Sequence, residues 1–188
     1  MIGAFVAVVG PSGSGKDSII EWARAALEGH DGVVFPRRRI TRPTGAGEDH
    51  DPASRGEFEA AERRGEFALT WRAHGLAYGI PADVFDVVQA DGIVVVNVSR
   101  AVLARLPSLF GNVRVVRVTV SVGVRLARIV ARGREDEAAA AARVARPDPA
   151  PDHPIDLEII NDGTLKEAGA ALAEFLARVS GGLNTPRS

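Results

Sequence analysis

The amino-acid sequence predicts an α/β fold in which a parallel sheet is covered by helices on both faces. Strand and helix patterns alternate along nearly the whole chain of 188 residues, which is typical of this architecture. The run 6–9 is continuously apolar and the run 93–98 is apolar except for Asn97, as expected of strands that are buried on both faces. A glycine-rich segment joins the first of these strands to the first helical pattern. The chain is long enough to form one domain with a full hydrophobic core.

The glycine-rich segment has the spacing G-x-x-x-x-G-K of a phosphate-binding loop. In such loops, backbone N–H groups and the first turn of a helix face the phosphates of a nucleotide, and the lysine adds a positive charge. The plainer alternative is a glycine-rich turn that binds no ligand. The predicted nucleotide-binding residues of this segment are Gly10, Pro11, Ser12, Gly13, Ser14, Gly15, Lys16, Asp17 and Ser18.

Composition excludes several classes of protein. The net charge is −1 and 46% of the residues are hydrophobic, so nothing suggests a nucleic-acid partner. The chain has no cysteine, which excludes disulfides, thiolate metal sites and cysteine nucleophiles. No apolar run resembles a signal peptide or approaches the length of a membrane span. We expect a cytoplasmic protein without a membrane partner, and the sequence leaves a homodimer open.

The other elements follow from apolar spacing and from residues that begin or end helices. Ser54 followed by Glu57 is a capping-box pattern, and Pro81 suits the first position of a helix. Four prolines within 147–154 predict a loop. The predicted helices cover 17–28, 54–64, 81–90, 100–109, 122–132, 135–144 and 165–179, and the further strands cover 33–35, 67–71, 93–98, 113–120 and 155–160.

The segment 41–79 interrupts the alternation with a polar stretch, a helix and antiparallel strands. We therefore expect a single domain over 1–180, with an inserted lobe at about 41–80 and a helical lid at about 125–146. Residues 181–188 are expected to form a flexible tail.

Three polar clusters indicate how a bound nucleotide would be used. Arg125, Arg128 and Arg132 share one helical face and suit a lid that brings positive charge to a transferring phosphoryl group. The arginines within 37–42 suit capture of a second phosphorylated substrate. Both clusters are also consistent with solvated basic surfaces. The segment 161–163, Asn-Asp-Gly, follows a strand and is either a polar edge beside the nucleotide base or a simple turn.

The order and spacing of these motifs resemble the guanylate kinase family over residues 5–179. Besides the loop, the resemblance rests on Thr41-Arg42 with Gly47-Glu48, on Tyr78-Gly79, on Arg132-Gly133 with Arg143, and on Asn161-Asp162. It implies a P-loop kinase core, ATP as phosphoryl donor and Mg²⁺ as its metal. It also implies that Arg42 and Tyr78 hold the acceptor's phosphate and that Asn161 and Asp162 lie by the adenine. The implied catalytic residues are Lys16, Arg128, Arg132 and Arg143.

The positions at which that family reads guanine differ here. Thr70, Ile80 and Ser99 stand where the family has a glutamate, a Ser or Thr, and an acidic residue. Gly45 replaces a second arginine that holds the acceptor's phosphate. A site built to hydrogen-bond guanine would lose most of its discrimination without these groups. GMP is therefore not the expected acceptor.

A sister family, the ribose 1,5-bisphosphate phosphokinases, fits these departures better. The similarity lies in Gly-Lys-Asp-Ser at 15–18 and in the segments 40–51, 73–81 and 95–100. It implies ATP-dependent phosphorylation of the 1-phosphate of ribose 1,5-bisphosphate, giving 5-phospho-α-D-ribose 1-diphosphate and ADP, in phosphonate breakdown. The acceptor-binding candidates are Arg39, Arg42, Glu48, Asp49, His50, Asp51, His74, Tyr78 and Arg100.

Several alternatives stay open at this point. Asp17 and Ser18 are the expected Mg²⁺ ligands, but Asp17 would equally suit a helix cap or a salt bridge. His50 and His74 are also consistent with structural roles. A nucleoside monophosphate kinase with another base preference, or a non-catalytic guanylate-kinase-like interaction module, would share most of these motifs.

Overall fold

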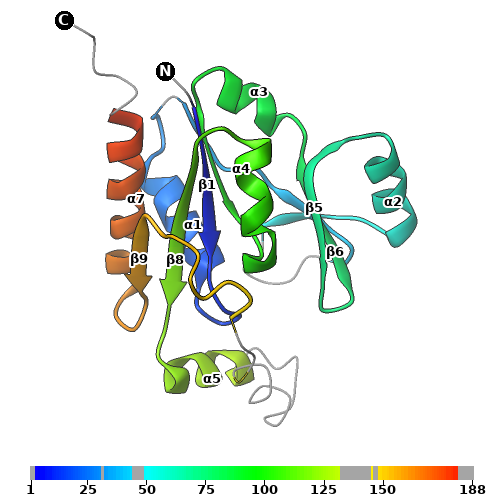
Figure 1. The fold of residues 1–188 in the computed structure, drawn as a ribbon. Coiled ribbons are helices and arrows are strands. Elements are labelled where there is room, and N and C mark those ends of the chain that lie inside the picture. The colour runs from blue at the N-terminus through cyan, green and yellow to red at the C-terminus, as the bar shows by residue number, and fades with distance from the viewer. Residues whose placement is uncertain (1–2, 31, 44–48, 132–144, 146–147, 182–188) are drawn as a thin grey trace, which may run out of the picture.

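A five-stranded parallel sheet forms the centre of the molecule (Figure 1). The computed structural model describes residues 3–30, 32–43, 49–131, 145 and 148–181. The strand order is β2-β7-β1-β8-β9, which confirms the predicted parallel α/β fold. These strands are β1 (Ala4–Val9), β2 (Val33–Val34), β7 (Ile93–Asn97), β8 (Val113–Thr119) and β9 (Leu157–Ile160). The helices are α1 (Lys16–Ala26), α2 (Arg55–Arg63), α3 (Val84–Gln89), the 3₁₀ helix η1 (Arg100–Arg105), α4 (Leu106–Leu109), α5 (Val122–Ala131) and α7 (Leu165–Gly181).

Strand β1 is buried along its whole length because helices cover both of its faces. Phe5 and Ala7 belong to the apolar cluster that includes residues of α3, η1 and α4. Val6 and Val8 point the opposite way, into the cluster formed with α1 and α7. This two-sided burial explains why the strand has no polar residue, and it fixes the position of the loop that follows it.

Helices α1 and α7 lie side by side on one face of the sheet (Figure 1). Their close approach depends on Gly169, because a Cβ atom there would lie 2.4 Å from Cδ2 of Trp22. The packing holds the helix that begins at Lys16 firmly against the core.

A second sheet, of four strands, lies to one side of the first (Figure 1). Its order is β4-β3-β6-β5, and α2 packs against β5. The strands are β3 (Arg38–Ile40), β4 (His50–Pro52), β5 (Phe67–Ala73) and β6 (Leu76–Pro81). The chain leaves the parallel sheet after β2 and returns to it through α3 and β7. The second sheet therefore begins at Arg38, inside the arginine-rich segment, rather than at about residue 41.

Several predicted boundaries are wrong. Pro81 ends β6 rather than starting a helix, and α3 begins only at Val84. The predicted helix 100–109 is divided into η1 and α4. The predicted capping box is confirmed, since Ser54 Oγ accepts the Glu57 N–H and the Glu57 carboxylate accepts the Ser54 N–H. The predicted helix 135–144 lies outside the described residues, as do Glu48, Arg132, Arg143 and the last seven residues of the tail.

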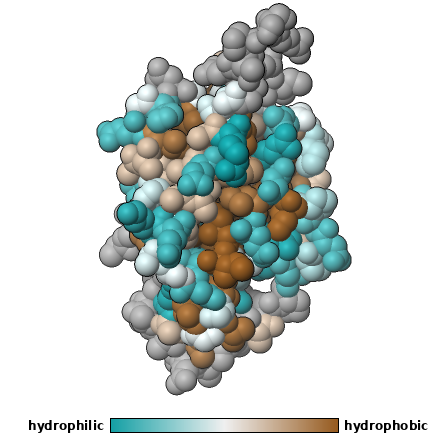
Figure 2. Space-filling view, turned by 90° about the vertical axis from the view of Figure 1, so that its left-hand side faces the viewer, coloured by the Kyte–Doolittle hydropathy of each residue, from teal (hydrophilic) through white to brown (hydrophobic). Residues whose placement is uncertain are grey.

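Apolar and polar side chains alternate on the surface that carries α7 and β9. Figure 2 shows a strip of apolar residues on this face, bordered by polar ones. Ile160 and Leu165 are among the exposed large apolar residues, with 68% and 44% of their surface accessible. Within the part of the chain that the structure describes, no helix has the length and apolar character needed to cross a membrane.

Candidate functional site

The phosphate-binding loop joins the carboxyl end of β1 to the first turn of α1. Gly10, Gly13 and Gly15 have φ values of 152°, 83° and 87°, which side chains rarely adopt. At Gly10 a Cβ atom would lie 2.2 Å from the carbonyl oxygen of Val118, in the neighbouring strand. The loop thus curls closely over the sheet, and at these positions glycine is needed because a side chain would strain the backbone or clash.

Lys16 folds back over the loop. Its ammonium group donates to the carbonyl oxygens of Gly10 and Pro11, each at 2.9 Å, and to Ser14 Oγ at 3.4 Å. These bonds hold the positive charge at the mouth of the loop, within reach of a phosphate that the loop amides would bind.

Two arginines of α5 reach the same loop. Arg125 Nε donates to the carbonyl oxygen of Ser12 at 2.9 Å. A guanidinium nitrogen of Arg128 lies 3.7 Å from the position that a Cβ atom of Gly15 would take. Figure 1 shows α5 at the carboxyl ends of β1 and β8, where the loop emerges. Positive charge from two elements therefore gathers over one phosphate-binding loop.

Asn161 and Asp162 meet backbone groups around the loop. The Asn161 side chain is buried, and its Nδ2 donates to the carbonyl oxygen of Ser14 at 2.8 Å. Asp162 Oδ1 accepts the N–H of Ser121, just before α5, at 2.7 Å. In this structure the two side chains position neighbouring backbone rather than forming an open polar edge.

Asp17 connects α1 to both sheets. Its Oδ1 accepts a hydrogen bond from Asn97 Nδ2, at the end of β7, and an ion-paired one from Arg38 of β3, each at 2.9 Å. Gly15, not Asp17, is the cap residue of α1, and no side chain caps that helix. The salt bridge is thus present and the helix cap is not.

The residues at this point fit a magnesium ion. Asp17 has a second carboxylate oxygen, and Ser18 presents an exposed hydroxyl one residue later. One carboxylate and one hydroxyl, completed by nucleotide phosphates and water, form a donor set that Mg²⁺ accepts. Among residues whose placement is described, no three or more acidic or histidine side chains are grouped as metal ligands.

A cavity of about 650 Å³ opens beside α1, at the carboxyl ends of β2 and β7. Asp17, Ser18 and Asp49 line it together with Arg38 and Asn97. Its remaining wall is largely apolar and includes Ile20, Trp22, Ala25, Phe35, Pro36, Val95, Val96 and Leu165. The polar end of the cavity therefore adjoins the residue that directly follows Lys16.

The acidic candidates of the second sheet are held by arginines. Arg37 Nε lies 2.7 Å from Asp49, which also pairs with Arg24 at 3.2 Å. Asp51 pairs with Arg37 at 3.2 Å. Arg39 points away from this cluster, since it pairs with Glu66 at 3.4 Å and lies over the Phe67 ring. The alternation of a strand puts Arg38, and not Arg39, at the cavity.

The two candidate histidines lie in different environments. His50 is 1% exposed in β4, with Nε2 lying 3.3 Å from the carbonyl oxygen of Arg42. His74 is exposed at the tip of the β5–β6 hairpin, with φ of 55°, and Gly75 follows with φ of 73°. Two consecutive positive φ angles are the mark of a type I′ turn.

Tyr78 stacks on Trp71 across the β5–β6 pair, with ring centroids 5.1 Å apart and an interplanar angle of 2°. Ile80, which the sequence comparison with guanylate kinases put beside a base, is fully buried in the core and does not line the cavity. Thr70 Oγ1 donates to Glu62 at 2.7 Å.

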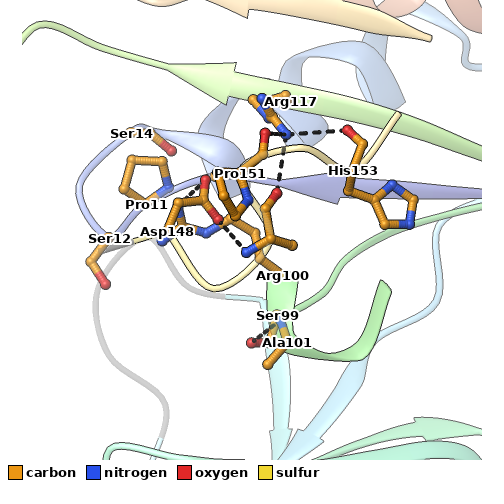
Figure 3. A network of polar contacts seen from close by, with 12 residues as sticks. Pro11, Ser12, Ser14, Ser99, Arg100, Ala101, Arg117, Asp148, Pro151 and His153 are labelled. Atoms are coloured by element: carbon orange, nitrogen blue, oxygen red, sulfur yellow. Dashed lines mark hydrogen bonds and ion pairs between the residues drawn. The ribbon is translucent and has the colours of Figure 1, made fainter. Parts of the chain in front are cut away.

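Arg100 joins a network that fixes the segment before β9 (Figure 3). It pairs with Asp148 at 2.6 Å. Arg117 donates to the carbonyl oxygens of Ala150, Pro151 and His153 at 3.2–3.4 Å. Arg117 pairs in register with Val9, the residue before the phosphate-binding loop. The segment 148–153 is therefore tied to the strand that borders the loop.

The Asp148 carboxyl group responds to this network. Its burial raises its pKa, but the Ala150 N–H and the Arg100 guanidinium outweigh that effect, so the pKa lies below its ordinary value. Sequence reasoning missed Arg117 and Asp148, and it placed Arg38 in the cluster 37–42 without singling it out. For Arg38, the two-residue alternation of a strand within 37–42 would have been the signal.

Comparison with known proteins agrees with this geometry. No family model matches the chain. It is 53% identical over 179 residues to the "ribose 1,5-bisphosphate phosphokinase PhnN" of Pseudofrankia inefficax, covering 95% of this chain and 93% of that one. With the protein of the same name from Acidiphilium cryptum it shares 46% identity over 176 residues, covering 94% and 93%.

Among solved structures, guanylate kinase from Anaplasma phagocytophilum superposes with a TM-score of 0.69 at 17% identity, covering 94% of this chain and 86% of that one. That likeness shows a guanylate-kinase-like fold. With relatives this similar over nearly their full length, the chain belongs to the ribose 1,5-bisphosphate phosphokinase family.

Proposed function

We propose that this protein is an ATP-dependent kinase that phosphorylates the 1-phosphate of ribose 1,5-bisphosphate, giving 5-phospho-α-D-ribose 1-diphosphate and ADP. The names of its relatives supply the reaction. The observation that carries it in this chain is the convergence of Lys16, Arg125 and Arg128 on one phosphate-binding loop. A phosphoryl-transfer site needs such positioned charge more than it needs a general acid or base.

The reaction requires two anions to be aligned. An oxygen of the sugar's 1-phosphate attacks the γ-phosphorus of ATP, and the bond from that phosphorus to the β-phosphate oxygen breaks, leaving ADP. The attacking oxygen is already anionic, so no base is needed. Lys16 and Arg128, with Arg132 and Arg143 as further proposed members, would neutralise charge on the transferring group.

Asp17 and Ser18 are the proposed Mg²⁺ ligands on the protein. Bound Mg²⁺ would supply positive charge to the nucleotide phosphates. Two neighbours would set how strongly Asp17 attracts the metal. Asn97 orients the Asp17 carboxylate, and Arg38 partly neutralises the negative charge of that carboxylate.

For the acceptor, we propose the polar end of the 650 Å³ cavity, where Arg38, Asp49 and Asn97 lie. A sugar bisphosphate there would adjoin α1 directly after Lys16. Arg42 and Tyr78 stay in the proposed acceptor set. Arg100 and Arg39 do not line this cavity but pair with Asp148 and Glu66 elsewhere, and the structure gives no support to their role in binding the acceptor.

The direct test is release of ADP with different acceptors. We expect release from ATP with ribose 1,5-bisphosphate and none with GMP or other nucleoside monophosphates. Release only with a nucleotide would favour a nucleoside monophosphate kinase, and no release with any acceptor would point to an interaction module. The variant Lys16→Met should abolish turnover without unfolding the chain, which controls for contaminating kinases.

A further inference from the structure

Asn161 is a buried polar residue, and its surroundings differ from those that the family resemblance implies. The resemblance implies that it lies by the adenine. Only 4% of its surface is exposed, however, and its Nδ2 donates to the carbonyl oxygen of Ser14 at 2.8 Å, across 147 residues of sequence. Strand β9 delivers the residue there, since the Asn161 N–H continues the ladder to β8 by donating to the carbonyl oxygen of Thr119 at 2.8 Å.

The bonded carbonyl belongs to the peptide that joins Ser14 to Gly15. In a trans peptide the C=O and the N–H point to opposite sides. An amide that holds the Ser14 oxygen on one side therefore directs the Gly15 N–H to the other side of the loop. Inward-pointing N–H groups of this kind are what bind phosphate in such loops.

The packing at Gly15 shows that Asn161 is fitted to the loop. A Cβ atom at Gly15 would lie 2.5 Å from Asn161 Nδ2, closer than such atoms approach, so a glycine is needed for the amide to reach Ser14. The φ of 87° at Gly15 requires the same residue independently. Loop and amide are thus complementary in shape as well as in hydrogen bonding.

We propose that Asn161 is a positioning residue of the phosphate-binding loop, which orients the Ser14–Gly15 peptide toward the polyphosphate of the donor, rather than a residue that reads the adenine. This rests on the proposed ATP-dependent function. The two roles predict different effects on ligand affinity. A residue that orients the loop affects the binding of every polyphosphate, whereas a residue that contacts the base affects only nucleotides that carry that base.

The test measures dissociation constants of ATP, GTP and inorganic tripolyphosphate by calorimetry, with no acceptor present. Removing the donor of a buried hydrogen bond should weaken binding about tenfold. For Asn161→Ala we expect the same loss with all three ligands and an unchanged ratio of ATP to GTP affinity. Asn161→Leu has a side chain of similar size but no donor and no charge and should behave alike, which covers the case in which the alanine variant does not fold. Glu158→Gln, an exposed change on the same strand, is the matched control.

A loss confined to ATP, with tripolyphosphate binding unchanged, would overturn the proposal and return Asn161 to the base. Unchanged binding of all three ligands would also overturn it. Since no acceptor is present, neither outcome depends on whether ribose 1,5-bisphosphate is the substrate. If wild-type protein binds all three ligands but releases no ADP with that sugar, the proposed function fails and this proposal stands.

Discussion

Under the proposed function, Asp17 is the residue at which the nucleotide and acceptor sides of the molecule meet. A single carboxylate oxygen accepts bonds from Asn97 in the parallel sheet and from Arg38 in the second sheet. Its neighbour Lys16 belongs to the phosphate-binding loop. Any change in the charge of Asp17 therefore acts on both sides at once.

We expect Asp17→Asn to raise the Mg²⁺ concentration needed for half-maximal activity by about tenfold, as loss of a metal-orienting group commonly does. The measurement is a Mg²⁺ titration of ADP release. Arg38→Gln should shift the titration the other way, because it removes a positive charge that competes for the carboxylate. An unchanged Mg²⁺ requirement in Asp17→Asn would show that this residue serves only the salt bridge.

His74 is a candidate that the family resemblance suggested for the acceptor site, but we expect that its role is to form the turn between β5 and β6. Asparagine also suits a left-handed position in a type I′ turn. We expect His74→Asn to leave the KM for the acceptor within about twofold and stability unchanged. A large rise in KM with normal stability would restore His74 to the acceptor site.

Residue-scale prediction from sequence succeeded where a local pattern has one geometric solution. The loop glycines are such a case, since their spacing predicts a tightly curled backbone, and Gly10, Gly13 and Gly15 have positive φ angles. A salt bridge was one of the alternatives for Asp17, but the sequence does not identify its partners. Arg38 and Asn97 lie 21 and 80 residues away, and only the tertiary fold brings them together.

At the scale of single elements, helix α2 shows how far local signals reach. Its capping box was predicted from two residues, and both of its hydrogen bonds are present. The bonds from Ser54 also lower the pKa of Glu57, so its carboxylate stays charged to a lower pH than that of an ordinary glutamate.

Replacing the cap residue should therefore be costly. We expect Ser54→Ala to lower the free energy of unfolding by about 1 kcal/mol, seen as a lower urea midpoint with an unchanged m value. Ser54→Asp keeps an acceptor for the Glu57 N–H and should retain most of the stability. Equal loss in both variants would mean that the cap contributes nothing.

Other elements could not be predicted because tertiary pairing overrides local preference. Pro81 suits the first position of a helix, yet it lies in β6, where it pairs with Phe67 of β5. Helix α3 therefore begins only at Val84. Strand β3 is three residues long and rich in arginine, so nothing in its composition distinguishes it from a loop. It exists because β6 and β4 pair with it on either side.

At the scale of the whole molecule, the pair Arg100–Asp148 ties η1 to the segment before β9. The pKa of Asp148 is lower in the folded chain than in the unfolded one, where it is about 3.9. Its contribution to stability is therefore present above about pH 4 and is lost as the pH falls through the folded value.

Asp148→Asn should lower stability at pH 7 by about 1 kcal/mol, since both partners are only partly shielded from solvent. The difference from the wild type should begin to shrink as the pH falls below about 4, where the unfolded chain takes up the proton, and should disappear as the pH falls through the lowered folded pKa. Thermal unfolding at pH 7 and at pH 3 measures it. Asp152→Asn, an exposed change nearby, should have no effect, and a difference that is undiminished at pH 3 would contradict the charge-based account.

The chain leaves the parallel sheet after β2, forms all four strands of the second sheet and rejoins the core at α3. The strands of the second sheet therefore belong to one continuous stretch of sequence. The residues that we assign to the donor nucleotide come before or after that stretch, whereas most acceptor candidates lie within it. Under the proposed function, exchange of this one continuous segment in evolution can therefore change which acceptor such a kinase binds, while the nucleotide-binding core stays the same. Asp17, which contacts the segment through Arg38, would be the residue of the donor side that has to change with it.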